Sequence, residues 1–250
     1  DDGGIGKPDC PFCEGLGYVM PDVAPGQPGF GRAVACVCRA AEQQAAQLDG
    51  LLRLSQIGAL ADCTFESFIP DGHGMTAAKQ RNLRMAFESA RAYSAAPVGW
   101  LVLKGGYGCG KTHLAAAIAN ARANAGEPVL FVVVPDLLDH LRATFNPSSN
   151  VRLDKRFDEV KSAPFLVLDD LGTESATAWA REKLYQLFNY RYSARLPTVI
   201  TTAVPIEELD PRLASRMLDG IRCTFFVIEA PSYRGKNMRA RRAGGRGQPR

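Results

Sequence analysis

The sequence lacks any long apolar run and any recognisable export signal. No uninterrupted apolar stretch approaches the length of about 20 residues that a membrane-spanning helix needs. The first four residues, Asp1 to Gly4, have neither the basic start nor the apolar core of a signal peptide. These absences predict a cytoplasmic protein without a membrane partner. The chain also begins on Asp1 rather than on methionine, which predicts processing or truncation and leaves room for a missing upstream segment.

The residues after Tyr233 lack acidic side chains altogether. They carry seven basic residues, although the net charge of the whole 250-residue chain is only +4. The rest of the chain is therefore slightly acidic. A basic tail of this kind can hold nucleic acid through phosphate contacts, or it can be a solvated end, and the sequence alone does not separate these two interpretations.

Composition and periodicity divide the chain into four predicted parts. Residues 1–38 are rich in glycine and proline and have too few apolar side chains for a core of their own. Residues 39–96 are predicted to form a helical linker, with helices over 39–60 and 75–95 on either side of an extended Thr64–Phe68 segment and a turn at Pro70–Gly72. Residues 97–234 are predicted to form the main domain, and residues 235–250 a basic, disordered tail.

The main domain alternates short apolar strands with helices. The strands are rich in branched and aromatic residues without strict alternation, which is typical of strands buried on both faces of a parallel sheet. They are predicted at Trp100–Leu103, Val129–Val134, Phe165–Leu168, Thr198–Thr201 and Thr224–Ile228, with helices near 112–125, 136–145, 151–161, 174–194 and 206–219. This order predicts a doubly wound α/β fold around a parallel five-stranded sheet.

A glycine-rich run with the spacing of a P-loop follows the first of these strands. The backbone N–H groups of such a loop turn toward phosphates, Lys111 can reach the β- and γ-phosphates, and Thr112 can supply a hydroxyl to Mg²⁺. The alternative is a flexible glycine turn, which the flanking strand and helix disfavour. The predicted ATP-binding residues are Gly105, Gly106, Tyr107, Gly108, Cys109, Gly110, Lys111, Thr112 and His113, with Cys109 as a small space-filling residue.

Two carboxylates follow the apolar run Phe165–Leu168. Ligands of open α/β sheets bind where parallel strands end, so both carboxylates are predicted to lie near the P-loop. We expect Asp169 to hold Mg²⁺ together with Thr112, and Asp170 to orient or deprotonate the attacking water. A solvated turn is the alternative for an Asp-Asp pair that lacks an upstream P-loop.

Four of the seven cysteines lie close to the N-terminus. Cys10 and Cys13 form a C-x-x-C knuckle, and Cys36 and Cys38 provide a second, tighter pair. Four thiolates suit a tetrahedral Zn²⁺, and an ATP-binding protein among reduced thiols is a poor candidate for disulfides. The spacing therefore predicts a structural zinc site, with unligated structural cysteines as the alternative.

Taken together, these motifs resemble the AAA+ ATPases of the bacterial helicase-loader group (DnaC/DnaI-like), with the transposition helper IstB as close kin. The stretches that carry the resemblance run in order along the chain from about Cys10 to Arg234. They are Thr64–Phe68, Val134–Leu138, Leu168–Gly172, Pro197–Thr202, Arg212–Met217 and Ser232–Arg234. The cysteine cluster is similar to the zinc module of these loaders.

The resemblance implies roles for two arginines that the sequence alone would leave as surface residues. Arg216 occupies the position of an arginine finger, which would reach the ATP of a neighbouring subunit, and Arg234 that of a sensor arginine acting in its own subunit. A finger that acts on the neighbour implies an ATP-dependent, head-to-tail homo-oligomer.

One position departs from the family pattern. Where the family usually has an asparagine that positions water near the γ-phosphate, this chain has Ala203, so Thr201 or Thr202 must replace the contact or it is lost. Asp170 also stands where many AAA+ proteins have glutamate. We therefore expect slow hydrolysis, with ATP acting mainly as an assembly switch.

The resemblance also implies partners. In the relatives the N-terminal region engages a hexameric replicative helicase, and the helix at 39–60 could either join that contact or pack on the core. Single-stranded DNA is expected on the inner face of the ring, where five residues are candidates for phosphate contacts and stacking, although a solvated helix face is an equal alternative. These are Arg142, Phe145, Arg152, Lys155 and Arg156.

The leading functional hypothesis is an AAA+ ATPase that loads or remodels a replicative helicase on single-stranded DNA. The nearest rival is a transposition helper that binds duplex DNA beside a transposase, and the cysteine knuckle and Thr64–Phe68 favour the loader. A weakly hydrolysing ATP-bound adaptor is a further alternative because of Ala203. A small-molecule kinase is disfavoured, since no acceptor-pocket motif is visible.

Overall fold

The computed structural model describes residues 6–20, 22, 24, 31, 33–39, 55–72, 74–143, 157–173 and 177–233. The chain divides into two compact units, Asp1–Gly50 and Leu51–Arg250, and each is described by itself. Several predicted features lie outside the described residues: Phe145, Arg152, Lys155, Arg156, Arg234, the tail 235–250 and positions 40–54 of the predicted helix 39–60. Among the described helices, none combines the length and apolar character that crossing a bilayer requires.

The first unit is built around a short antiparallel hairpin. Strands β1 (Tyr18–Val19) and β2 (Val34–Ala35) pair Tyr18 with Ala35 and Val19 with Val34, and a 3₁₀ turn, η1 (Val37–Arg39), follows. Ahead of β1 the chain folds tightly on itself. The backbones of Gly6 and Gly17 are so close that a Cβ on Gly6 would lie 2.5 Å from the backbone nitrogen of Gly17. This turn-rich arrangement agrees with the prediction that the segment has no apolar core.

The second unit contains a sheet of five parallel strands in the order β4-β5-β6-β3-β7. Their bounds are β3 (Trp100–Gly105), β4 (Val129–Val133), β5 (Phe165–Leu171), β6 (Thr198–Thr202) and β7 (Cys223–Ile228). The predicted α/β fold with a parallel five-stranded sheet is therefore confirmed. The prediction that the third strand ends at Leu168 is wrong, because β5 continues through both carboxylates to Leu171.

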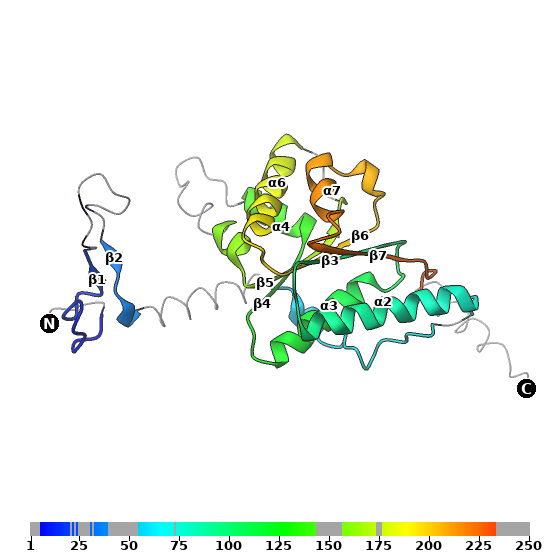
Figure 1. Ribbon diagram of the computed structural model, residues 1–250, viewed down its shortest axis with the longest axis horizontal. Coiled ribbons are helices and arrows are strands. Elements are labelled where there is room, and N and C mark those ends of the chain that lie inside the picture. The colour runs from blue at the N-terminus through cyan, green and yellow to red at the C-terminus, as the bar shows by residue number, and fades with distance from the viewer. Residues whose placement is uncertain are drawn as a thin grey trace, which may run out of the picture. The chain divides into compact units, whose positions relative to one another are not determined.

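Helices cover both faces of the sheet (Figure 1). Leu101 and Leu103 point to the face covered by α2 (Ala77–Ala95) and α3 (Lys111–Asn124). Trp100 and Val102 point to the opposite face, which is covered by α4 (Val134–Ala143), α6 (Ala178–Ser193) and α7 (Pro211–Met217), with a further helical stretch at 157–162. Burial on both faces explains why the strand sequences show no polar alternation.

Local chemistry corrects two of the predicted helices. The helix predicted over 206–219 is interrupted, since η3 (Ile206–Glu208) ends and α7 begins anew at Pro211. Asp210 caps α7 by accepting a hydrogen bond from the Arg212 amide, 2.8 Å away, and proline at the first helical position suits such a start. Within the predicted helix 39–60, the described end forms only the 3₁₀ turn η2 (Ile57–Leu60).

The Thr64–Phe68 segment is a turn rather than the extended segment that was expected. Its hydroxyl groups replace strand pairing with local hydrogen bonds. The Ser67 hydroxyl accepts from the Thr64 amide at 3.0 Å and donates to the Asp62 carbonyl at 2.7 Å, while the Thr64 hydroxyl accepts from the Ser67 amide at 3.2 Å. Serine and threonine favour such turns over sheet pairing for this reason.

Segments that precede the sheet in the sequence bond to both of its edge strands. On β4, Phe131 donates to the Ser55 hydroxyl and accepts from the Gln56 amide, while Val133 donates to the Gln56 side-chain oxygen, at 3.1, 2.9 and 3.0 Å. At the end of β7, the Asn82 side chain donates to the Val227 carbonyl and accepts from the Glu229 amide, both at 2.9 Å. Side chains and the Gln56 amide thus occupy backbone groups that an edge strand leaves open.

Candidate functional site

The P-loop connects the end of β3 to the first turn of α3. Lys111 begins the helix and is only 5% exposed, and its ammonium group donates to the carbonyls of Gly105 and Gly106 at 2.9 Å each. These contacts hold the amine beside the loop at the positive end of a helix. A buried cation at a helix N-terminus is suited to bind phosphate.

At two positions of the loop, neighbouring side chains and a positive φ leave room only for glycine. Gly108 has φ +73° and lies against Ser232, where a Cβ would overlap the side-chain oxygen. Gly110 has φ +106°, and a Cβ there would lie 3.0 Å from the Phe68 ring. The Tyr233 amide also donates to the Gly108 carbonyl at 2.9 Å. The loop is therefore held between the chain that follows β7 and the turn around Phe68.

The remaining predicted loop residues differ in exposure. Cys109 is buried, and burial raises the pKa of its thiol, which fits a space-filling residue better than a nucleophile. Tyr107 is exposed at 71%. The His113 Nε2 atom lies 3.0 Å from the Thr64 carbonyl, and its ring packs edge-on against Phe68. His113 therefore joins α3 to the Thr64–Phe68 turn.

The first predicted carboxylate lies directly against the P-loop helix. The Thr112 hydroxyl is 3.1 Å from both carboxylate oxygens of Asp169, and the Thr201 hydroxyl donates to Asp169 Oδ1 at 2.6 Å. Asp169 is 4% exposed, and burial raises the pKa of its carboxyl group, while the hydrogen bonds from Thr201 and Thr112 oppose the rise. A hydroxyl and a carboxylate side by side provide the hard oxygen ligands that Mg²⁺ prefers.

The hydroxyl groups around Ala203 already have protein acceptors. Thr201 donates to Asp169, and Thr202 donates to the Leu171 carbonyl at 2.8 Å. A hydroxyl has a single hydrogen to donate, so in this arrangement neither threonine has one left for a phosphate oxygen. Asp170 has φ +60° and donates its amide to Thr201 at 3.0 Å.

A cavity of about 280 Å³ opens beside the P-loop, next to Gly108–His113 and Ala230–Tyr233. Its far wall is mostly apolar and comes from the segment that precedes the sheet, with Leu60, Cys63, Phe68, Ile69, Met75 and Leu83. Such a wall suits a flat aromatic base whose phosphates lie on the loop. Sequence reasoning did not assign these residues to the site, although the apolar side chains of a turn between two helices were an available signal.

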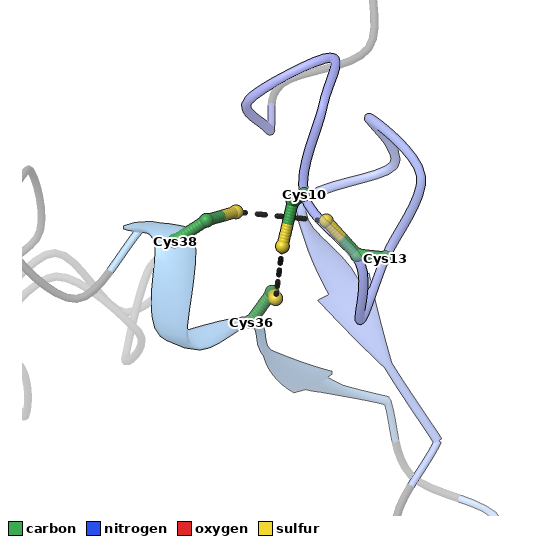
Figure 2. A group of neighbouring side chains, drawn as sticks. All are labelled: Cys10, Cys13, Cys36 and Cys38. Carbon is green, nitrogen blue, oxygen red and sulfur yellow. Dashed lines mark hydrogen bonds between the residues drawn. The ribbon is translucent and has the colours of Figure 1, made fainter.

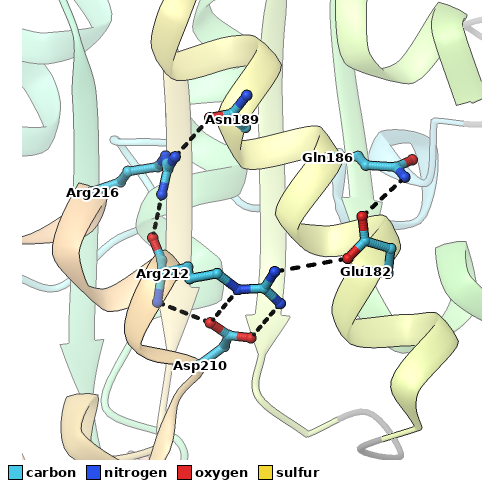
Figure 3. Close-up of polar contacts among 6 residues, drawn as sticks. All are labelled: Glu182, Gln186, Asn189, Asp210, Arg212 and Arg216. Carbon is cyan, nitrogen blue, oxygen red and sulfur yellow. Dashed lines mark hydrogen bonds and ion pairs between the residues drawn. The ribbon is translucent and has the colours of Figure 1, made fainter.

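The side chain of Arg216, the predicted arginine finger, is held by residues of α6 and α7. Arg216 donates to the Asn189 side-chain oxygen at 2.6 Å and to the Arg212 carbonyl at 2.7 Å (Figure 3). Arg212 in turn lies between Asp210 and Glu182, at 2.9 and 3.8 Å. Both guanidinium groups lie over the Tyr185 ring. The structure thus groups Arg216 with polar residues of α6 and α7, and Arg234 lies outside the described residues.

Arg142 is the one predicted DNA contact that the structure describes. Its guanidinium group lies 5.4 Å from the centre of the Trp179 ring and 3.7 Å from the Asp139 carboxylate. Its side chain remains 47% exposed. These contacts anchor Arg142 on the α4 and α6 face, and its role with nucleic acid stays a prediction.

In the first unit, the four predicted metal ligands converge (Figure 2). The sulfur atoms of Cys10 and Cys36, and those of Cys13 and Cys38, lie 3.5 Å apart, and all four lie within 4.8 Å of one another. Zinc bound to four sulfurs at about 2.3 Å places them about 3.8 Å apart. The amide of Phe12 is the main cause that lowers the pKa of the Cys10 thiol, whereas burial and the neighbouring thiols raise the pKa of Cys36 and of Cys38. The donor set therefore fits zinc.

Comparison with known proteins places these sites in context. Residues 73–241 match the family described as IstB-like ATP binding protein. The replicative helicase loader DnaC of Escherichia coli (strain K12) is 26% identical over 181 residues, which cover 70% of each chain. The replicative helicase loader DnaI of Bacillus subtilis (strain 168) is 36% identical over 110 residues, 44% of this chain and 34% of that one.

A solved structure agrees with this assignment at the level of the fold. The crystal structure of the DnaC helicase loader superposes with a TM-score of 0.56 and 24% identity, covering 67% of this chain and 97% of the other. This likeness confirms the AAA+ core fold that the sequence resemblance implied. Because the family match spans most of the chain and includes the whole P-loop and both carboxylates, the chain belongs to the IstB-like ATP-binding proteins.

Proposed function

We propose that the protein is an ATP-dependent loader or remodeller of a replicative helicase on single-stranded DNA. The observation that carries the proposal is the contact of Thr112 with both oxygens of Asp169, 3.1 Å each, beside the buried Lys111. This is the arrangement that a Mg²⁺-nucleotide needs. The relatives in Escherichia coli and Bacillus subtilis are both named replicative helicase loaders, which supports the choice of partner.

Each predicted side chain has a role in this proposal. Lys111 neutralises the β- and γ-phosphates, Thr112 and Asp169 hold Mg²⁺, and Asp170 orients the attacking water. Arg216 completes the site of a neighbouring subunit, so ATP favours a homo-oligomer. Its bonds to Asn189 and to the Arg212 carbonyl would have to open for that contact. Arg234 acts in its own subunit.

We propose that hydrolysis is slow and that ATP serves mainly to switch assembly. Ala203 provides no donor, and the hydroxyl hydrogens of Thr201 and Thr202 are directed to Asp169 and to the Leu171 carbonyl. An Ala203→Asn variant should therefore hydrolyse ATP faster in a single turnover. Equal rates for the variant and the natural chain would contradict the assignment of position 203.

The test of the proposed partner is association with a purified hexameric replicative helicase. We expect co-elution with ATP and Mg²⁺ and its loss in the Lys111→Ala variant, whose folding is checked by circular dichroism. Single-stranded DNA and the helicase together should stimulate ATP hydrolysis. If the chain binds ATP but associates with no replicative helicase from several bacteria, the loader proposal fails.

A transposition helper acting on duplex DNA is the second candidate, and the IstB-like family match favours it. ATPase assays separate the two candidates. For a transposition helper, duplex DNA should stimulate hydrolysis more than single-stranded DNA with helicase does. A third candidate is an adaptor that binds ATP and does not hydrolyse it. Helicase association without measurable turnover, in the presence of DNA, would favour that adaptor.

A further inference from the structure

The strand that carries the two carboxylates contains an irregularity at their position. Along β5 and β6, Leu168 pairs with Ile200, yet Leu171 pairs with Thr202. Two residues of β5, Asp169 and Asp170, therefore stand opposite the single residue Thr201. This two-against-one count is a β-bulge, a feature that redirects side chains at functional sites.

The bulge is accompanied by an unusual backbone conformation. Asp170 has φ +60°, which residues with a Cβ seldom adopt, and no glycine is present to relieve it. A hydrogen bond stabilises this conformation, since the Asp170 amide donates to the Thr201 hydroxyl at 3.0 Å. Without that acceptor, the amide would lose its partner in a half-buried position.

The same hydroxyl holds the neighbouring carboxylate. It donates to Asp169 Oδ1 at 2.6 Å, and the Thr201 side chain is completely buried. One oxygen atom thus accepts from the backbone of Asp170 and donates to the side chain of Asp169. The Thr112 hydroxyl touches the same carboxylate from the α3 side.

We propose that Thr201 is a positioning residue that clamps the bulge and thereby fixes the Asp169 carboxylate for Mg²⁺ and the Asp170 backbone for water activation. The inference rests on the proposed Mg²⁺-ATP function of this site and adds a residue to it. Thr201 touches neither phosphate nor metal in this proposal, and it acts through the two aspartates. Residues that orient a metal ligand in this way typically affect metal affinity by about 10- to 100-fold.

The next residue along β6, Thr202, offers a matched control. Thr202 is equally buried and has the same hydroxyl group, but it donates to the Leu171 carbonyl and accepts from the Val204 amide, at 2.8 and 3.1 Å. Its hydroxyl contacts neither carboxylate. Valine replaces threonine with nearly the same shape, so Thr201→Val and Thr202→Val each remove one buried hydroxyl from the same strand.

The test is a Mg²⁺ titration of the binding of a fluorescent ATP analogue, followed by single-turnover hydrolysis, on the full chain. For Thr201→Val we expect the Mg²⁺ concentration at half-saturation to rise about tenfold and the hydrolysis rate to fall about tenfold. Binding of the analogue in EDTA should be unchanged, because Lys111 and the loop are intact. Thr202→Val should match the natural chain in both measurements, and Thr201→Ser should restore them.

Two outcomes would overturn the inference. One is a Mg²⁺ half-saturation in Thr201→Val equal to that of the natural chain, and the other is an equal shift in Thr202→Val, which would indicate a general effect of strand packing. If Thr201→Val does not fold, Thr201→Cys, whose thiol is a weak donor, takes its place with an expected smaller shift. A natural chain that binds Mg²⁺-ATP but does not hydrolyse it would count against the proposed ATPase function alone, since the Mg²⁺ titration still tests Thr201.

Discussion

Asp169 is the residue at which the proposed binding of Mg²⁺ and the stability of the folded chain conflict most directly. Its carboxyl group is buried, and burial raises its pKa above the ordinary value of 3.8 even though two hydroxyl groups stabilise the charge. A raised pKa means that the folded chain holds the proton more tightly than the unfolded chain does. The stability that this group provides therefore falls as pH rises from 3.8 through the raised pKa.

The first prediction follows from the upward direction of the Asp169 pKa shift. Asp169→Asn should raise the free energy of unfolding of the nucleotide-free protein at pH 7, and the gain should shrink as pH falls through the raised pKa. Mg²⁺-dependent ATP binding should be lost in the same variant. Urea unfolding across this pH range measures the first effect. The exposed Asp139→Asn variant is the control, and a less stable Asp169→Asn protein at pH 7 would contradict the prediction.

A second prediction concerns the two variable glycines of the P-loop. Gly108→Ala should weaken ATP binding by at least about tenfold, because φ is +73° and the new methyl group would collide with Ser232. Gly106→Ala is the matched control, since a Cβ there meets no atom within 4 Å. Isothermal titration calorimetry of both variants with Mg²⁺-ATP compares them. Equal affinities would show that the contact with Ser232 does not restrict the loop.

At the scale of elements, one buried arginine joins a helix to the starts of two strands. Arg191 of α6 is completely buried, and burial lowers its pKa to about 9. Its guanidinium group donates to the carbonyls of Lys161, Ala163 and Pro197 and to the Thr198 hydroxyl, at 2.7 to 3.0 Å. The cation thus satisfies three carbonyl groups just before β5 and β6 begin, at the end of the strands opposite the nucleotide site.

We predict that Arg191→Met lowers the free energy of unfolding by about 3 to 5 kcal/mol, because the buried carbonyls lose their donors. Arg181→Met, an exposed arginine of the same helix, should change it by less than about 0.5 kcal/mol. Thermal and urea unfolding of the two variants compare these values. Similar stabilities would mean that water replaces the guanidinium group at these carbonyls.

The elements differ in how far the sequence determines them. The strands around Leu101 and Leu166 were predictable because their apolar residues are adjacent in the chain, and the P-loop because its spacing is local. The continuation of β5 through Asp169 and Asp170 was not, since it depends on the Thr201 hydroxyl of another strand. The apolar cavity wall escaped prediction for the same reason, because its members come together only when the turn at Phe68 packs on α3.

The whole molecule consists of two compact units with different kinds of core. The first unit has a core of four cysteines with few apolar neighbours, whereas the second has a large apolar core on each face of its sheet. A small unit without an apolar core relies on its metal for folding. The second unit has its own apolar core and contains the complete P-loop and Asp169, so we expect it to fold without that metal.

We therefore predict that Cys36→Ser lowers the zinc content from about one ion per chain to near zero, since one ligand of a tetrahedral site is lost. Nucleotide binding by the second unit should be unaffected. Cys63→Ser, a cysteine of the second unit, is the control for zinc content. Elemental analysis of protein purified without chelators measures it, and an unchanged zinc content in Cys36→Ser would refute the four-cysteine site.

The side chains that bond to the edge strands affect how copies of this protein can associate. An open strand edge can recruit an extended peptide or a strand of a second molecule, which leads to aggregation. Here Ser55 and Gln56 form hydrogen bonds with the backbone N–H and C=O groups of Phe131 and with the N–H group of Val133. Asn82 does the same for backbone groups at the end of β7. Little continuous backbone is left for strand addition on β4, which disfavours fibre-like growth at that edge. If copies of the chain associate as proposed, contact through side-chain surfaces is therefore favoured over strand addition on β4, and the identity of each surface residue decides which partner fits.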